Sequence, residues 1–262
     1  MQMKTFRSTN LLFLASCTLA LLGASELAFG QADEIQVYDG GLAAPGQFNL
    51  TLHNNFTPRG SKTPAFPGAI VSNHSLNGVP EWAYGVNDWF EAGLYLPLYS
   101  ISKDRGASLD GFKLRTLFAV PHADDRDWFY GVNFEFSYNA KHWDTTRITS
   151  EIRPILGLHL DRVDIIINPI LDTAYDGFKK LDFAPAARIA YNFSPTWALA
   201  AEEYADFGPL HHFYSAKEQS HQLFAVVNHN TKALNIEAGI GFGLTKGSDR
   251  LTLKLILSHD FN

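Results

Sequence analysis

The chain has 262 residues and a net charge of −6, with 46% hydrophobic, 13% aromatic and 18% charged residues and one cysteine. This composition argues against a disordered chain, and the absence of a Lys/Arg cluster argues against nucleic acid as a partner. A single cysteine excludes an internal disulfide framework and a cysteine-based zinc site.

The first residues have the pattern of a secretory signal. Two basic residues precede an apolar run over 11–24, and the small residues Ala28, Gly30 and Ala32 follow with the spacing of a cleavage site. The apolar run is short for a transmembrane helix, which needs about 20 residues. We therefore expect residues 1–32 to be a signal peptide that is cleaved.

Cleavage has two consequences for the mature chain. It removes Lys4, Arg7 and Glu26, which changes the net charge from −6 to −7, and it removes Cys17, the only thiol. A lipoprotein cleavage box ending at Cys17 is the alternative, but the apolar run continues past this residue. Residues 33–45 are expected to form a periplasmic N-terminal segment, which is also positioned to enter a barrel from the periplasm.

From residue 46 onward, apolar and polar side chains alternate with the period of two that is typical of strands. Over 128–139, aromatic and apolar residues at even positions alternate with Asn133, Glu135, Ser137 and Asn139. The pattern predicts about twelve strands, near 46–56, 78–86, 89–100, 110–120, 127–139, 147–160, 163–174, 183–193, 196–206, 220–228, 233–244 and 250–261.

These strands predict a transmembrane antiparallel up-and-down β-barrel of the bacterial outer-membrane type over 46–262. Most are long enough for a tilted strand to cross a bilayer, which takes about nine to eleven residues, and their number is even. The longer connections, such as 57–77 and 207–219, fall on the external side, and Trp128, Phe193, Trp197 and Phe261 fall at the periplasmic rim. A soluble sandwich also alternates, but it does not explain strand length, loop order and aromatic placement together.

Several stretches resemble known outer-membrane proteins. The last strand, Leu251–Phe261, resembles the terminal strand that the outer-membrane assembly machinery reads, although Asn262 follows the usual final Phe. Residues 46–56, 76–94 and 191–197 are similar to a family of barrels loosely named for a phenol-degradation (MetA) pathway, whose members are also described as porins or transporters. The resemblance implies an outer-membrane barrel embedded in lipid but does not name a solute.

Charged residues on the inward face near mid-strand form what we call the lumen belt. Its members are Arg115, Glu135, Arg153, Arg188, Glu202, Glu237 and Lys254. One interpretation is a constriction that selects small solutes, anions among them, because the belt has four positive and three negative charges. The other is a salt-bridge network that fills the lumen and supports the wall, since charges in a narrow space of low dielectric must be paired.

The sequence gives little support for a phosphate-binding or metal-binding site. Gly239, Gly241 and Gly243 have phosphate-loop spacing, but strand alternation continues through them, so they are expected to leave room in the lumen. His211, His212 and Glu218 share a loop without the fixed spacing of a metal site. We expect no cofactor, no metal and no catalytic residues. The predicted function is an outer-membrane channel or transporter for a small solute, with a closed structural or partner-binding barrel and an outer-membrane enzyme as alternatives.

Overall fold

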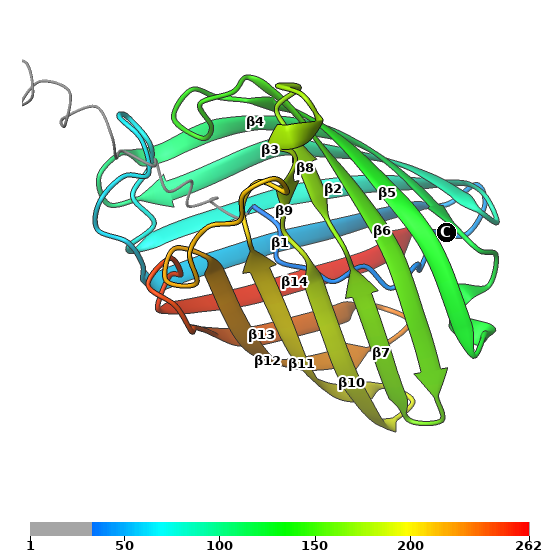
Figure 1. Cartoon of the computed structure of the whole chain (residues 1–262). Coiled ribbons are helices and arrows are strands. Elements are labelled where there is room, and N and C mark those ends of the chain that lie inside the picture. Colours follow the sequence, from blue (N-terminus) through cyan, green and yellow to red (C-terminus); the bar gives the residue numbers. More distant parts are fainter. Residues whose placement is uncertain (1–32, 262) are drawn as a thin grey trace, which may run out of the picture.

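The computed structural model describes residues 33–261 and shows a closed antiparallel β-barrel (Figure 1). Its strands are β1 (Phe48–Arg59), β2 (Ser75–Asn87), β3 (Phe90–Ser102), β4 (Gly106–Ala119), β5 (Trp128–Asn139), β6 (Ile148–Leu160), β7 (Val163–Asn168), β8 (Leu171–Thr173), β9 (Asp182–Phe183), β10 (Ala186–Ser194), β11 (Trp197–Asp206), β12 (Ser220–Asn230), β13 (Asn235–Gly243) and β14 (Leu251–Phe261). The helical elements are two single turns, η1 (Ala123–Asp125) and η2 (Phe178–Lys180). Strands β1 to β7 and β10 to β14 pair in chain order within each run, β7 and β8 both pair with β6, β7 also pairs with β10, and β8 pairs with β9. The barrel closes where β1 pairs with β14.

The fourteen elements make twelve wall strands. β8 continues β7 after a break at Pro169 and Ile170, and β10 continues β9 after a break at Ala184 and Pro185. Proline has no N–H to give to the ladder, so pairing stops at both prolines. The predicted barrel of about twelve antiparallel strands is therefore confirmed, and the two continuous strands expected at 163–174 and 183–193 are each interrupted once.

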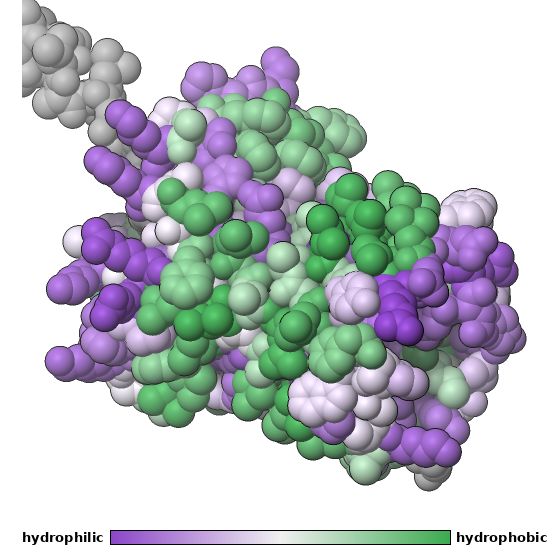
Figure 2. Space-filling model, turned by 90° about the horizontal axis from the view of Figure 1, so that it is seen from below, coloured by the Kyte–Doolittle hydropathy of each residue, from purple (hydrophilic) through white to green (hydrophobic). Residues whose placement is uncertain are grey.

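The exterior of the wall is apolar. Outward side chains such as Trp128, Leu199 and Phe242 are 62%, 55% and 50% exposed, whereas the inward Phe129, next to Trp128 in β5, is 1% exposed. Apolar side chains gather across the middle of the face in Figure 2, with hydrophilic ones toward its two ends. Such a wall satisfies its backbone hydrogen bonds by closure and presents apolar side chains to lipid.

No helix within residues 33–261 is long and apolar enough to cross a membrane.

The two ends of the barrel differ as expected, with one exception. One end has the connections 60–74, 103–105, 140–147, 174–181, 207–219 and 244–250, and the other has 88–89, 120–127, 161–162, 195–196 and 231–234. The exception is 103–105, which is short because β3 and β4 extend further than predicted. We call the first end external and the second periplasmic. The predicted rim aromatics Trp128, Phe193, Trp197 and Phe261 lie at periplasmic strand ends and are exposed.

Residues 33–45, which we call the N-terminal segment, lie inside the barrel. In Figure 1 the blue chain before β1 passes through the interior. Gly46 N–H donates to Gly85 O at 2.7 Å near the periplasmic end, and Asn55 Nδ2, further along β1, donates to Asp33 O at 2.9 Å. The segment therefore runs from the periplasmic rim to about mid-height, which is the lumenal position that the sequence left open for it.

Candidate functional site

The first half of the lumen belt is an ion-pair network on β2–β6. Arg115 on β4 contacts Glu81 at 2.6 Å and also pairs with Glu91. Lys113 contacts Glu135 at 3.3 Å, and Arg153 contacts Glu151 at 2.6 Å. The register explains this arrangement, because Glu135 lies directly opposite Arg115 on one side and Glu151 on the other, so inward side chains of three strands meet.

The second half lies on the opposite wall. Arg188 on β10 and Lys254 on β14 each pair with both Glu202 and Glu237. Lys254 Nζ is 2.5 Å from Glu237, and the side chains of Lys254 and Glu202 are both fully buried. Tyr204 Oη also donates to Glu202 at 2.6 Å. The seven belt residues are thus all inward and paired, but they form two networks instead of a single ring.

The N-terminal segment joins these networks. Lys254 Nζ donates to Ile35 O at 3.2 Å, and Arg153 donates to Gln36 O at 3.2 Å from the other wall. Asp33 adds a salt bridge of 2.8 Å to Lys113. Cations of the belt therefore donate hydrogen bonds to backbone carbonyls of the N-terminal segment, and these bonds hold the segment across the lumen at mid-height.

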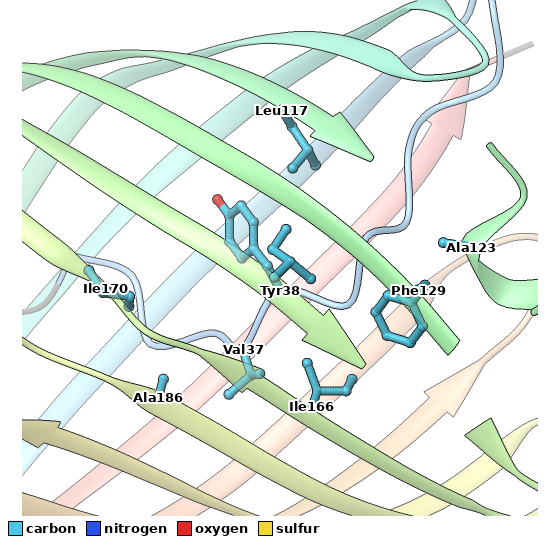
Figure 3. Packing of buried hydrophobic residues seen from close by; sticks show 9 residues of the cluster. Val37, Tyr38, Leu117, Ala123, Phe129, Ile166, Ile170 and Ala186 are labelled. Carbon is cyan, nitrogen blue, oxygen red and sulfur yellow. The ribbon is translucent and has the colours of Figure 1, made fainter. Parts of the chain in front are cut away.

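Apolar contacts fix the segment on the β4–β10 side. Figure 3 shows Val37 and Tyr38 among side chains from the surrounding wall, with Ile166 and Phe129 nearby. The backbone of Tyr38 is held by Asn168, whose side chain accepts from its N–H at 2.7 Å and donates to its O at 3.0 Å. The Tyr38 hydroxyl meets that of Tyr95 at 2.5 Å, and its ring lies 4.4 Å from the Arg153 guanidinium. These contacts bury the side chains of Val37 and Tyr38 to 5% exposure.

Glu34 is the least satisfied group of the segment. Its closest cation is Arg153 at 3.6 Å, and neither carboxylate oxygen has a hydrogen bond. Burial raises the pKa of Glu34 to about 7, with a further contribution from the negative charge of Glu135. Glu34 is thus a buried acid that titrates near neutral pH.

Glycines make room for large inward side chains. A Cβ at Gly241 would lie 2.3 Å from the Phe224 ring, and one at Gly157 would lie 1.9 Å from the Phe129 ring. A Cβ at Gly239 would lie 3.1 Å from the Lys254 side chain. Gly239 and Gly241 therefore leave room for inward side chains, as expected, whereas a Cβ at Gly243 would lie 2.3 Å from the backbone O of Asp249.

A polar cavity of about 290 Å³ remains between the N-terminal segment and the wall formed by β1, β2 and β12–β14. Asn49, Asn230 and Asp260 from periplasmic strand ends line it, as do Tyr38 and Arg115 from the mid-lumen. We call this cavity the periplasmic vestibule. It shows that the N-terminal segment fills only part of the lumen.

The structure adds charged residues that the sequence did not include in the belt. The inward direction of four of them can be predicted from strand alternation: Glu91, Lys113, Glu151 and Asp172. The inward direction of Glu81 is harder to predict, because its inward neighbours Val79 and Ala83 are apolar. Around the belt at mid-lumen the cations are Lys113, Arg115, Arg153, Arg188 and Lys254, and the acids are Asp33, Glu34, Glu81, Glu91, Glu135, Glu151, Asp172, Glu202 and Glu237. The sequence suggested a belt with one more positive than negative charge, but this mid-lumen set has more acids than cations. Whether the belt selects a solute stays a prediction.

Histidines contribute locally. His159 pairs with Asp164 at 2.7 Å across the 161–162 turn. Glu203 on β11 pairs with His221 at 3.0 Å. Ser248 Oγ bonds the backbone of His221 and not its ring, so this pair does not activate a serine. Within residues 33–261 no three His, Cys, Asp or Glu side chains are arranged to hold a metal.

No family model matches the chain, and no curated protein matches it. Among solved structures, an outer-membrane channel from Pseudomonas putida F1 is similar with a TM-score of 0.59 and 13% identity, covering 87% of this chain and 100% of that one. The KdgM porin in complex with disordered oligogalacturonate has a TM-score of 0.53 and 7% identity, covering 82% and 99%. At these identities the likeness shows the fold, which is that of outer-membrane barrels.

Together with the apolar exterior, this likeness indicates the bacterial outer membrane as the location of the protein. The resemblance to the phenol-degradation family stays a prediction, because no family model supports that name. The expected signal peptide lies outside the described residues.

Proposed function

We propose that the protein is an outer-membrane channel or transporter for a small solute, with the lumen belt as its selectivity element. The observation that carries the proposal is the periplasmic vestibule, a polar cavity that extends from the belt to the periplasmic strand ends. A barrel with a purely structural role has no need of a cavity at this level, and close packing would be expected to fill it.

In this proposal the N-terminal segment narrows the passage and the external loops control access. The segment crosses the lumen at mid-height, held by Lys254 and Arg153. At the external end, loop 60–74 folds inward, since Ile70 is 2% exposed and its N–H donates to His142 O at 3.2 Å. A solute then passes beside the segment or requires it to move.

A second candidate is a closed structural or partner-binding barrel. The same contacts of the N-terminal segment favour it, because they occlude the lumen at mid-height. The enzyme alternative has less support, since the outer-membrane channel and the KdgM porin named above are not enzymes. Assembly through the C-terminal strand, which ends at Phe261 paired with Phe48, also remains a prediction.

Single-channel recording in planar bilayers tests the proposal. The mature protein is compared with the Arg115→Ala/Arg153→Ala variant and with a deletion of residues 33–44. We expect discrete steps whose ion preference changes in the double variant and whose conductance rises in the deletion. If all three proteins are folded, as judged by heat-modifiable mobility in gels, and all three are silent, the channel proposal is wrong.

A further inference from the structure

The charges of the described chain are unevenly distributed along the barrel axis. The external end has eleven basic and nine acidic residues, whereas at the periplasmic end only Arg126, Arg162 and Lys232 are basic. The acids of the periplasmic turns and adjacent strand ends are Asp88, Asp124, Asp125, Asp127, Asp161 and Asp164. Asp39 and Asp260 add two more within the periplasmic vestibule. The negative potential is therefore concentrated at the periplasmic half.

The vestibule itself has a negative lining. Its charged groups are Asp39, Glu81, Glu91, Glu237, Asp260 and a single cation, Arg115, which is already paired with Glu81 and Glu91. Glu237 is paired with Lys254 and Arg188. Asp39 and Asp260 accept hydrogen bonds only from neutral groups, the Gly41 N–H at 3.0 Å and Asn49 Nδ2 at 2.7 Å. Within residues 33–261, neither of these two carboxylates has a salt bridge.

The neutral lining is rich in oxygen acceptors. Asn230 and Asn235 line the cavity from either side of the 231–234 turn, as do Thr51 and Ser258, whose hydroxyls are hydrogen-bonded to each other at 2.9 Å. The only aromatic ring of the lining, Tyr38, already stacks with Arg153. Oxygen acceptors suit a protonated primary amine, which has N–H donors, whereas a quaternary ammonium ion is usually held by an aromatic cage.

We propose that the periplasmic vestibule is a binding site for small organic cations with protonated primary amines, and that it gives the barrel a preference for cations. Asp39 and Asp260 supply the unpaired negative charge, and the surrounding amides accept the remaining amine N–H groups. A cavity of about 290 Å³ is at the small end of ligand pockets, which begin at about 300 Å³. A role of this site in transport rests on the proposed function, whereas the negative charge of the site can be measured in a protein that conducts no ions.

The first test measures the vestibule potential with a single introduced thiol. Since the mature chain is expected to have none, Ser258→Cys places one in the vestibule and Ala216→Cys places one in an exposed external loop. Each thiol is modified by a cationic reagent, trimethylammonium-ethyl methanethiosulfonate, and by its anionic sulfonate analogue. The readout is the rate of thiol modification by the cationic reagent divided by the rate with the anionic one. We expect this ratio to be at least about tenfold higher at Ser258→Cys, because opposite charges attract and like charges repel in a narrow polar cavity.

Two further comparisons make the test specific. In the Ser258→Cys background, Asp39→Asn/Asp260→Asn should lower the ratio by about tenfold, whereas Asp161→Asn, which removes a periplasmic turn charge outside the cavity, should change it little. 1,4-Diaminobutane should slow the cationic reagent at Ser258→Cys more than tetraethylammonium does. Equal ratios at the two thiols, or no effect of the double Asn variant, would overturn the proposal.

Bilayer recording separates this inference from the proposed function. Conductance with a reversal potential favouring cations supports both. Conductance that favours anions overturns the vestibule proposal and leaves the channel standing. Silent bilayers with a high thiol ratio at Ser258→Cys overturn the channel and leave a cation-binding vestibule in a closed barrel.

Discussion

Replacement of Lys254 by Met tests the second ion-pair network most directly. The side chains of Lys254 and Glu202 are both fully buried, and Lys254 also contacts Glu237 at 2.5 Å and the carbonyl of Ile35 at 3.2 Å. Removing the ammonium leaves two carboxylates with Arg188 as their only shared cation. Breaking a buried pair costs about 3–5 kcal/mol, mainly because one charge stays buried and uncompensated.

The expected result is a loss of about 3–5 kcal/mol in the free energy of unfolding of Lys254→Met. A second variant separates this cause from loss of packing. In Lys254→Met/Glu202→Gln, the remaining Arg188 and Glu237 form a one-to-one pair, so most of the loss should be recovered. The matched control is Lys180→Met, because its pair with Asp176 is 63% and 59% exposed and should contribute less than about 1 kcal/mol.

Equilibrium unfolding in denaturant, with the protein in detergent micelles and followed by tryptophan fluorescence, measures these differences. The reasoning is refuted if Lys254→Met unfolds within about 1 kcal/mol of wild type at an unchanged denaturant slope. It is also refuted if the double variant is as unstable as the single one, since the loss would then come from packing and not from an unpaired charge.

Three further outcomes are expected. Because the pKa of Glu34 is raised from 4.5 to about 7, docking of the N-terminal segment should be strongest below pH 4.5 and weaken as the pH rises through about 7. The hydrogen-exchange protection factors of residues 33–45, which correct for the intrinsic pH dependence of exchange, should fall over this range, and Glu34→Gln should flatten the fall. Gly241→Ala should lower the free energy of unfolding by about 1–3 kcal/mol, because its Cβ would meet the Phe224 ring at 2.3 Å; an unchanged denaturation midpoint would contradict this. Glu203→Gln should change stability by less than about 1 kcal/mol in the same assay, since its pair with His221 is half-exposed.

The wall could be predicted from the sequence because alternation is a local signal. Over residues 130–139 of β5, aromatic residues point outward and Asn133, Glu135 and Ser137 point inward, so each residue's face follows from its neighbours. β2 was less predictable, since the structure begins it at Ser75 and the pattern predicted its start at residue 78. Its inward Val79 packs with Tyr95 and Leu98, so apolar residues occupy both faces and the period of two is blurred.

The contents of the lumen were less predictable. Residues 33–45 have no periodicity, and their position depends on partners such as Lys254 and Arg153, which are far away in the sequence. The inward direction of the belt residues was predictable from their strands, but their pairing was not. It depends on barrel curvature and on the N-terminal segment, which contributes the acids Asp33 and Glu34 to the first network.

The position of the N-terminal segment also constrains how the barrel is assembled. The segment is joined to β1, and the barrel closes only when β1 pairs with β14, which follows all the other described strands in the chain. Its contact with Lys254 spans 219 positions in the chain, and its contact with Asn168 spans 130. Contacts of such long range form late, because loop closure must precede them. The chain must therefore either enclose its own beginning as the sheet curls shut or thread it into a finished wall, and the first route avoids passing Tyr38 through a narrow, charged opening.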